Sequence, residues 1–412
     1  MIEYSNRRIK LNGGIILDNF RFYVPTDIRF GKDRLASELT QVLDTFGKTV
    51  LIVYGGGSIK KNGLYDQVID LLEKNQNNIV ELSGVEPNPR IETVRRGVEL
   101  CRENQVDVIL AVGGGSTIDC SKVVAAGFYS EEDPWEFIVG KNGYQGDALP
   151  IVTILTLAAT GSEMNAGAVI SNMATNQKLG VGGPAMMPKV SFLDPTTTFT
   201  VPAYQTAAGS ADILSHLFES YFNVTEGTDI QDFVSEGIMR AVIKNCPVAL
   251  ETPNDYDARA NLMWASSLAL NGLTRNGKHG VWSCHAMEHE LSAFYDITHG
   301  VGLAILTPRW MEYVLNEQTV TKFVEFAKNV WGIEDENQFT AAKKGIQATY
   351  DFFKACGIPM TLPEVGIDEE KFAEMAQQAV AHSTIKTDAF VPLTEADVEA
   401  IYRSSLTESS FA

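Results

Sequence analysis

The sequence has few cysteines, and none of them are spaced as a CxxC motif. The five that occur are scattered along the chain: Cys101, Cys120, Cys246, Cys284 and Cys356. An odd number without paired spacing argues against a disulfide framework and against a closed zinc site made of thiolates. We therefore expect a reducing cytoplasm, in which each cysteine is a small buried hydrophobe or a weakly reactive thiol.

Basic residues are also scarce. The chain has 33 Lys and Arg against 52 Asp and Glu, which gives a formal net charge of −19. Such a charge argues against nucleic acid or an anionic membrane as a partner. No apolar run approaches the length needed to cross a bilayer, and the opening MIEYSNRRIK lacks the apolar core of a signal peptide. We expect a cytoplasmic protein.

Apolar residues make up 45% of the 412-residue chain, which allows a substantial core. The length predicts two or three domains. In the first half, apolar runs at 49–57, 78–84 and 106–116 alternate with amphipathic segments such as PRIETVRRGVELCRENQ. This βαβαβα order is typical of a parallel sheet with helices on its faces.

The composition changes after about Pro202. Segments such as AAGSADILSHLFESYF and VWSCHAMEHELSAFY have helical periodicity, and few strand signals occur. We therefore predict an α/β domain with a Rossmann-like parallel sheet at residues 1–200 and an all-α domain at residues 201–412.

Three consecutive glycines end one apolar run, in AVGGGSTID. Glycines between a strand and a helix let the backbone approach a phosphate, and the helix N-terminus offers unpaired N–H groups. The stretch fits neither the Walker A pattern nor GxGxxG, so it does not say which nucleotide binds. A tight turn without a ligand is the alternative.

A second glycine run, VYGGGSIKKNG, ends an earlier strand. Sheets that bind NAD often carry an acidic residue there, which accepts the ribose hydroxyls. Here Gly55, Gly56, Gly57 and Ser58 take that place, with two lysines close behind. Glycine amides, a hydroxyl and lysines suit a 2′-phosphate, which a carboxylate would repel. The run predicts NADP(H) rather than NAD(H), and a glycine turn with solvated lysines is the alternative.

Histidines are scarce too, yet three of the six lie in SCHAMEHELSAFYDITHG. His285 and His289 are four residues apart, so on a helix they share one face. Two interpretations stay open on this evidence. The side chains are either partly buried and bonded to backbone carbonyls, or part of a metal or proton-transfer site.

The segment SADILSHLFESYF places Asp212 and His216 four residues apart near the start of a predicted helix. Such a pair is usually structural. Together with the histidine cluster, however, it completes a set of carboxylate and imidazole ligands of the kind that binds Zn²⁺ or Fe²⁺. Ligands from two helices indicate a metal buried between them and open to a substrate.

Four motifs together resemble the iron-containing (group III) alcohol dehydrogenase family: GGGSTID, AATGSEMNAGAVI, SADILSH and HAMEHELSAFYDITHGVGLAILTP. The resemblance runs from about residue 9 to 403 and is closest to the bacterial NADPH-dependent butanol dehydrogenase and aldehyde reductase branch. It implies an N-terminal dinucleotide-binding domain, a helical metal-binding and substrate domain, a cleft between them and a homodimer.

The resemblance also implies roles for individual residues. The metal ligands are Asp212, His216, His285 and His299. The residues near the cofactor are Gly113, Gly114, Gly115 and Ser116 at the pyrophosphate with Asp119 nearby, Thr156 and Thr160 at the nicotinamide, and Lys178 at its ribose. His289 is left unligated near the nicotinamide and substrate, whereas the spacing argument alone pairs it with His285.

The expected chemistry follows from these parts. A divalent metal acts as a Lewis acid on an alcohol or carbonyl oxygen while hydride moves between the substrate carbon and the nicotinamide. His289 either relays the hydroxyl proton to water or only orients its neighbours. Three imidazoles and a carboxylate suit Fe²⁺ and Zn²⁺ alike.

Two other functions are considered. A cyclase or lyase of the dehydroquinate synthase type resembles this layout, with NAD and zinc, but its phosphorylated acidic substrates need clustered lysines and arginines. The stretch AFYDITHGVGLAIL is mostly apolar or aromatic, which favours a small uncharged alcohol or aldehyde. A non-catalytic metal or nucleotide sensor is disfavoured by the complete ligand set and by His289.

Overall fold

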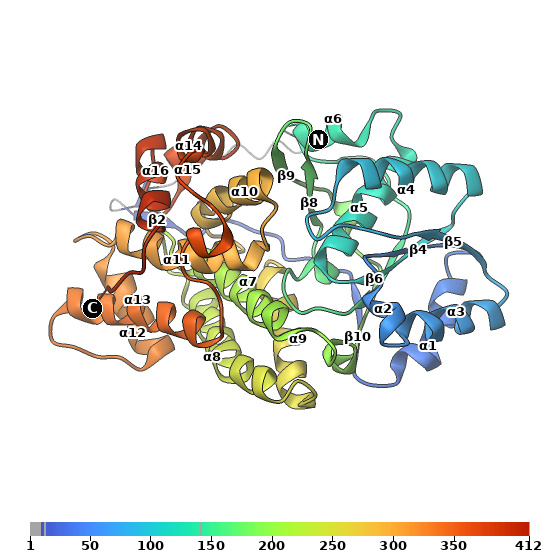
Figure 1. The fold of residues 1–412 in the computed structure, drawn as a ribbon, viewed down its shortest axis with the longest axis horizontal. Coiled ribbons are helices and arrows are strands. Elements are labelled where there is room, and N and C mark those ends of the chain that lie inside the picture. The colour runs from blue at the N-terminus through green and yellow to red at the C-terminus, as the bar shows by residue number, and fades with distance from the viewer. Residues whose placement is uncertain (1–9, 12–13, 141, 412) are drawn as a thin grey trace.

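The computed structural model describes residues 10–11, 14–140 and 142–411. They form two parts that lie side by side, one built on a sheet and one built of helices (Figure 1). Within this described portion, no helix is both long and apolar enough to cross a membrane.

The sheet has six strands, and every neighbouring pair runs parallel. In order across the sheet they are β3 (Asp27–Phe30), β10 (Val190–Leu193), β7 (Ile151–Leu155), β6 (Val108–Gly113), β4 (Thr49–Tyr54) and β5 (Asn78–Leu82). The parallel sheet predicted from the alternating runs is confirmed.

Successive residues of the central strands pack on opposite faces of this sheet. From β4, Leu51 and Val53 join an apolar cluster with helices α4 and α5, while Val50 and Ile52 join another with α1 and α3. Both faces are covered, which is why the strands are continuous apolar runs. The helices are α1 (Arg34–Asp44), α3 (Leu64–Lys74), α4 (Ile91–Asn104), α5 (Gly115–Tyr129) and the short α6 (Pro134–Val139).

An antiparallel hairpin extends from the sheet part. It is not among the elements predicted from the sequence. It consists of β8 (Gly167–Asn172) and β9 (Gln177–Gly182). In its turn, Asn176 has a left-handed backbone with φ of 48°, which asparagine tolerates better than most residues. β9 packs against helix α10 of the other part.

The helical part is centred on α7, of which every residue from Thr206 to Tyr221 is buried. Its helices are α7 (Ala203–Tyr221), α8 (Asp229–Glu251), α9 (Tyr256–Leu270), α10 (Ser283–Tyr295), α11 (His299–Val314), α12 (Val320–Trp331), α13 (Gln338–Ala355), α14 (Phe372–Ala381), α15 (Ile385–Asp388) and α16 (Glu395–Ser404). The predicted helical character is confirmed, apart from the two-residue strand β11 (Thr225–Glu226).

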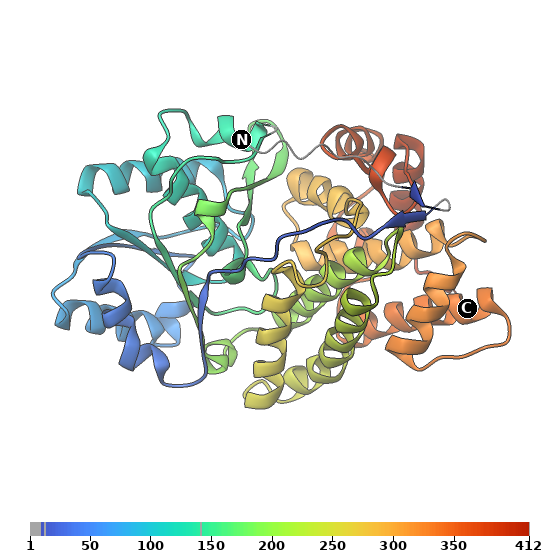
Figure 2. The same cartoon turned by 180° about the vertical axis from the view of Figure 1, so that it is seen from behind.

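The N-terminal strands lie at the helical part, and the chain then crosses to the sheet part (Figure 2). β1 (Lys10–Leu11) pairs with β2 (Gly14–Ile16), and β2 pairs in parallel with β11. Strands β1 and β2 are therefore attached to the second half, and the division at residue 200 stays a prediction.

Candidate active site

Three helices bring the predicted metal ligands together. α7 carries Asp212 and His216 one turn apart, α10 carries His285 in its first turn, and α11 begins at His299. The Nε2 atoms of these imidazoles, in chain order, lie 3.5, 3.9 and 3.7 Å from Oδ1 of the aspartate. Ligands about 2.1 Å from an ion in a tetrahedron lie about 3.4 Å apart, so this spacing suits a divalent metal.

Three of the candidate ligands, Asp212, His216 and His285, are buried, and His299 is partly exposed. Among the described residues, Oδ1 of Asp212 and Nε2 of His285 have no hydrogen-bond partner. Desolvation raises the pKa of Asp212 to about 7 and lowers the pKa of His216 and of His299 well below the usual range. One carboxyl oxygen surrounded by imidazole nitrogens is the donor set that Fe²⁺ or Zn²⁺ binds, so these residues fit either ion.

Two glutamates hold the opposite ring nitrogens, and sequence reasoning missed both. Glu219, on α7, accepts hydrogen bonds from Nδ1 of His285 and from the amide of Cys284. Glu288, on α10, accepts one from Nδ1 of His299. A carboxylate behind a ligating imidazole fixes its tautomer and leaves Nε2 for the metal. The only sequence signal is that each glutamate lies three residues after a candidate histidine.

His289 lies one helical turn after His285, with ring centroids 6.3 Å apart. The spacing argument pairs these two, but Asp212, His285 and His299 form the group with mutually close ligand atoms. A second such group contains Glu288, His289 and His299. Desolvation lowers the pKa of His289 well below its usual value, so its imidazole is neutral and is a weaker base than a solvated histidine.

Residues of the sheet part reach this centre as well. Lys178, on β9, is buried, and its Nζ lies 3.4 Å from Oε2 of Glu288 and 3.3 Å from Nδ1 of His299. Asn88, in the loop after β5, donates a hydrogen bond of 2.8 Å to Asp296, just before α11. Both parts of the molecule therefore contribute to the site.

The predicted phosphate loop connects β6 to α5. β6 ends at Gly113 and α5 begins at Gly115, so the helix N-terminus lies at the carboxyl edge of the sheet. A Cβ at Gly113 would lie 2.4 Å from Oγ1 of Thr117, and one at Gly115 would lie 2.2 Å from Oγ1 of Thr160. These glycines are therefore needed for packing, whether or not a phosphate binds. The Ser116 hydroxyl donates to a backbone carbonyl.

Other predicted cofactor residues lie beside this loop. The amide of Thr156, after β7, donates a 3.0 Å hydrogen bond to the carbonyl of Gly113. Asp119 is placed differently, because its buried carboxylate accepts hydrogen bonds from the Ser162 hydroxyl at 2.5 Å and the Val169 amide at 2.8 Å. Its oxygens are therefore bonded within the sheet part, next to β8.

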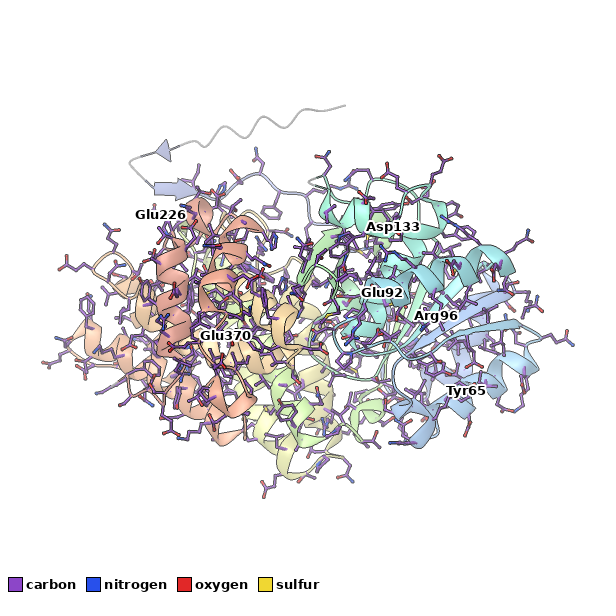
Figure 3. The ribbon with its side chains drawn as sticks, turned by 45° about the horizontal axis from the view of Figure 1, so that its top comes forward. Tyr65, Glu92, Arg96, Asp133, Glu226 and Glu370 are labelled. Atoms are coloured by element: carbon purple, nitrogen blue, oxygen red, sulfur yellow. The ribbon has the colours of Figure 1, made fainter. Side chains whose placement is uncertain are left out.

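The second glycine run leads from β4 into the short helix α2 (Ser58–Lys61). A Cβ at Gly56 or Gly57 would meet no atom within 4 Å, so open space lies beside this backbone. Nζ of Lys60 lies 4.2 Å from the ring centroid of Tyr65, which Figure 3 labels, and 5.0 Å from that of Tyr54. Ser58 and Lys61 are exposed, and the run has no acidic side chain.

Comparisons with known proteins agree with this arrangement over both parts. A family model described as iron-containing alcohol dehydrogenase matches residues 25–195, and one described as Fe-containing alcohol dehydrogenase family, C-terminal, matches residues 206–406. The chain is 54% identical over 388 residues to NADH-dependent butanol dehydrogenase A of Clostridium acetobutylicum, covering 94% of this chain and 99% of that protein.

Two further relatives differ in the cofactor that their names give. NADPH-dependent aldehyde reductase YqhD of Escherichia coli is 38% identical over 369 residues, covering 89% of this chain and 94% of that protein. The crystal structure of an NADH-dependent butanol dehydrogenase A from Thermotoga maritima superposes with a TM-score of 0.90 at 40% identity, covering 95% of this chain and all of that one.

Proposed function

The chain belongs to the iron-containing alcohol dehydrogenase family, and from that premise we propose metal-dependent hydride transfer between NADP(H) and a short-chain primary alcohol or its aldehyde. The broader activity, an alcohol or aldehyde oxidoreductase of the butanol dehydrogenase type, follows from the family and the relatives. The proposed metal dependence is carried by one observation, the convergence of three imidazole nitrogens on one oxygen of Asp212.

In this proposal Asp212, His216, His285 and His299 hold Fe²⁺ or Zn²⁺. When bound, the ion supplies Lewis acidity at the substrate oxygen, and the nicotinamide supplies or accepts the hydride. The protein buries Asp212, His216 and His285, and desolvation lowers the pKa of His216 and of His299. Loss of activity on aerobic handling, restored by Fe²⁺ under anaerobic conditions, identifies iron, whereas air-stable activity identifies zinc.

The cofactor is proposed to lie along the carboxyl edge of the sheet. The loop from Gly113 to Ser116 would bind the pyrophosphate at the N-terminus of α5, where N–H groups and the helix dipole favour an anion. Thr156 and Thr160, next to this loop, would contact the nicotinamide half. Lys178 would then contact the ribose from the other side, where its ammonium group already faces the metal ligands.

His289 is proposed to move the proton of the substrate hydroxyl. Its imidazole is neutral, and its ring centroid lies 5.7 Å from that of His299. Because His289 lies one helical turn from a candidate ligand, it would be close to the substrate hydroxyl and could exchange a proton with it.

The substrate class is tested with purified enzyme. Reduced cofactor and butanal are mixed, and the absorbance of the reduced nicotinamide is followed. We expect stoichiometric oxidation of the cofactor with the aldehyde. A series from acetaldehyde to hexanal, with one diol, then identifies the preferred chain length. No oxidation with any of these aldehydes would refute the proposed substrate class.

The preference for NADP(H) is proposed from the run Gly55–Ser58. It has no carboxylate, it borders open space, and it offers amides and the exposed hydroxyl of Ser58 to a 2′-phosphate. Lys61 is free to add a charged hydrogen bond, which contributes roughly 1.5–3 kcal/mol. The relatives named above include NADH-dependent and NADPH-dependent enzymes, so the loop itself carries this proposal.

The variant Gly56→Asp tests the preference. Gly56 does not have a left-handed backbone and a Cβ meets nothing within 4 Å, so the loop accepts the new side chain. We expect kcat/KM to favour NADPH in the unaltered enzyme by about one order of magnitude or more, and this preference to be lost or reversed in the variant. Gly56→Ala is the matched control and should keep the preference. An unaltered enzyme that favours NADH would refute the assignment.

We also propose a cytoplasmic homodimer with a dinucleotide-binding domain at residues 1–200 and a metal-binding domain at residues 201–412. Exposed aromatic side chains support self-association, since Phe20, Phe22 and Tyr23 are 53%, 48% and 63% exposed. Size-exclusion chromatography with light scattering tests the dimer, because a single species with the mass of one chain would contradict it.

A further inference from the structure

Glu288 joins the two parts of the molecule at the centre of the site. It is completely buried on α10, and its carboxylate accepts hydrogen bonds from Nδ1 of His299 and from the hydroxyl of Ser292. Nζ of Lys178, on β9 in the sheet part, lies 3.4 Å from Oε2 of the same carboxylate. One side chain therefore contacts a candidate metal ligand and a candidate cofactor ligand together.

The surrounding helix leaves space for this side chain. A Cβ at Gly302, on α11, would lie 2.8 Å from Cγ of Glu288 and 3.0 Å from its Oε1. The absence of a side chain at this position lets the carboxylate lie between α10 and α11. The packing is therefore built around Glu288.

The contacts among Lys178, Glu288 and His299 determine which of their atoms carry protons. Lys178 carries only donors, and a carboxylate accepts, so the ammonium group donates to Glu288. Nδ1 of His299 carries the ring proton and donates it to Glu288. Nε2 of the same ring then has a free lone pair, and it faces Asp212. A cation beside a histidine that binds a dication is unfavourable unless a negative charge compensates it.

Glu219 provides an internal comparison. It holds Nδ1 of His285 as Glu288 holds that of His299, and it accepts the amide hydrogens of Cys284 and His285. Within the described part of the chain, however, no lysine or arginine forms an ion pair with it. Both glutamates therefore bind Nδ1 of a histidine, and within the described residues only Glu288 also pairs with a lysine.

We propose that Glu288 is a positioning residue with two tasks: it directs Nε2 of His299 toward the metal, and it anchors the ammonium group of Lys178 where the cofactor binds. This inference rests on the proposed function, because both the metal and the cofactor belong to it. Through Glu288, the hairpin β8–β9 and the metal-binding helices share one polar centre.

The test uses metal-stripped full-length protein and two binding measurements. Zinc affinity is measured by competition with a chromophoric chelator, and NADPH affinity by cofactor fluorescence without metal. The variants are Glu288→Gln, which keeps the shape of the side chain, Glu219→Gln as the matched control, Lys178→Met, and Glu288→Gln combined with Lys178→Met. Circular dichroism and thermal unfolding confirm that each variant is folded.

We expect Glu288→Gln and Glu219→Gln each to weaken zinc binding by about 10- to 100-fold. Only Glu288→Gln should also weaken NADPH binding, by about tenfold, because the ammonium group loses its anchor. In the Lys178→Met background, Glu288→Gln should no longer change NADPH affinity, while its effect on zinc persists. The cobalt-substituted protein adds a spectroscopic check, since its visible bands should shift in Glu288→Gln.

Each outcome separates this inference from the proposed function. An unaltered protein that binds neither zinc nor NADPH would refute the proposed function. Unaltered zinc affinity in Glu288→Gln would overturn the first task. An equal loss of NADPH affinity in Glu219→Gln, or a persisting loss in the Lys178→Met background, would overturn the second. If Glu288→Gln does not fold, Lys178→Met alone decides the second task, because unchanged NADPH affinity would refute it.

Discussion

Two histidines of the candidate metal centre are held at Nδ1 by a buried glutamate and present Nε2 to Asp212. The chemistry of the site depends on this choice of nitrogen, because an imidazole that carries its proton on Nε2 cannot bind a metal there. His216 differs, since its Nδ1 is buried without a hydrogen-bond partner among the described residues. Its orientation depends on packing alone.

The first residue-scale prediction concerns metal retention. Asp212→Ala or His285→Ala should lose the bound metal and lower turnover by roughly 10²–10⁴-fold, because a metal contributes several kcal/mol to transition-state stabilisation. The sheet part should stay folded, since its apolar clusters do not include these side chains. Elemental analysis of purified variants is the measurement. Full metal content in either variant would show that the assignment of that residue as a metal ligand is wrong.

The second residue-scale prediction concerns His289. His289→Ala should keep the metal and lower turnover by about 10²–10⁴-fold, which is typical of a lost acid–base group. The pH profile of kcat should change as well. His382→Ala, at the partly exposed C-terminal end of α14, is the control and should leave turnover much less affected. Unchanged turnover and an unshifted profile in His289→Ala would leave it only a structural role.

The sequence predicts much of this site because its residues lie in two local motifs. Asp212 and His216 share a helix turn, and the histidine cluster runs from the first turn of α10 to the start of α11. Spacing alone pairs His285 with His289, whereas the packing of α10 against α11 brings His299 to His285. Glu219 and Glu288 could not be predicted, because a glutamate three residues after a histidine is common on exposed helices.

At the scale of elements, the strand-to-helix turn at β6 and α5 depends on glycine for packing. Gly115→Ala should lower the free energy of unfolding by about 1–3 kcal/mol, because its Cβ would meet Thr160 at 2.2 Å. Gly56→Ala is the matched control in open space, and it should change stability by less than about 1 kcal/mol. Urea denaturation measures both. Equal stability of the two variants would contradict the packing argument.

The hairpin β8–β9 shows where sequence reasoning at this scale stops. The parallel strands are continuous apolar runs covered on both faces, which makes them easy to predict. The hairpin includes small and polar residues, as in GAVISN and QKLGVG, and its stability comes from contacts with α5 and α10. Such tertiary contacts leave little local pattern, although the hairpin carries Lys178.

At the scale of the whole molecule, one further contact joins the two parts. Nδ1 of His382 lies 3.1 Å from Oε1 of Glu290, on α10, and Nε2 lies 3.3 Å from the amide nitrogen of Gln177, on β9. The hydrogen bond to Glu290 raises the pKa of His382. Desolvation raises the pKa of Glu290 too, so burial outweighs the effect of its partner on that carboxyl.

This contact should make stability depend on pH in a defined direction. Because the folded pKa of His382 is raised, its contribution is fully present below the unfolded value of about 6.5 and is lost as pH rises through the folded pKa. His382→Gln should therefore destabilise the protein more at pH 6 than at pH 9. In a Glu290→Gln background this pH-dependent difference should vanish. Thermal unfolding across the range measures it, and a difference that grows with pH would contradict the assignment.

The parallel pairing of β2 with β11 has a consequence for the nascent chain on the ribosome. Residues 15 and 16 are made about 200 residues before their partners at 225 and 226. At the usual speed of translation this is an interval of roughly 10–40 s. During that time the parallel sheet can acquire its last strand, β10, while β2 still has an unpaired backbone edge. The strand therefore leaves the exit tunnel well before its partner, and during the interval its free edge is a natural binding site for chaperones that protect extended chains.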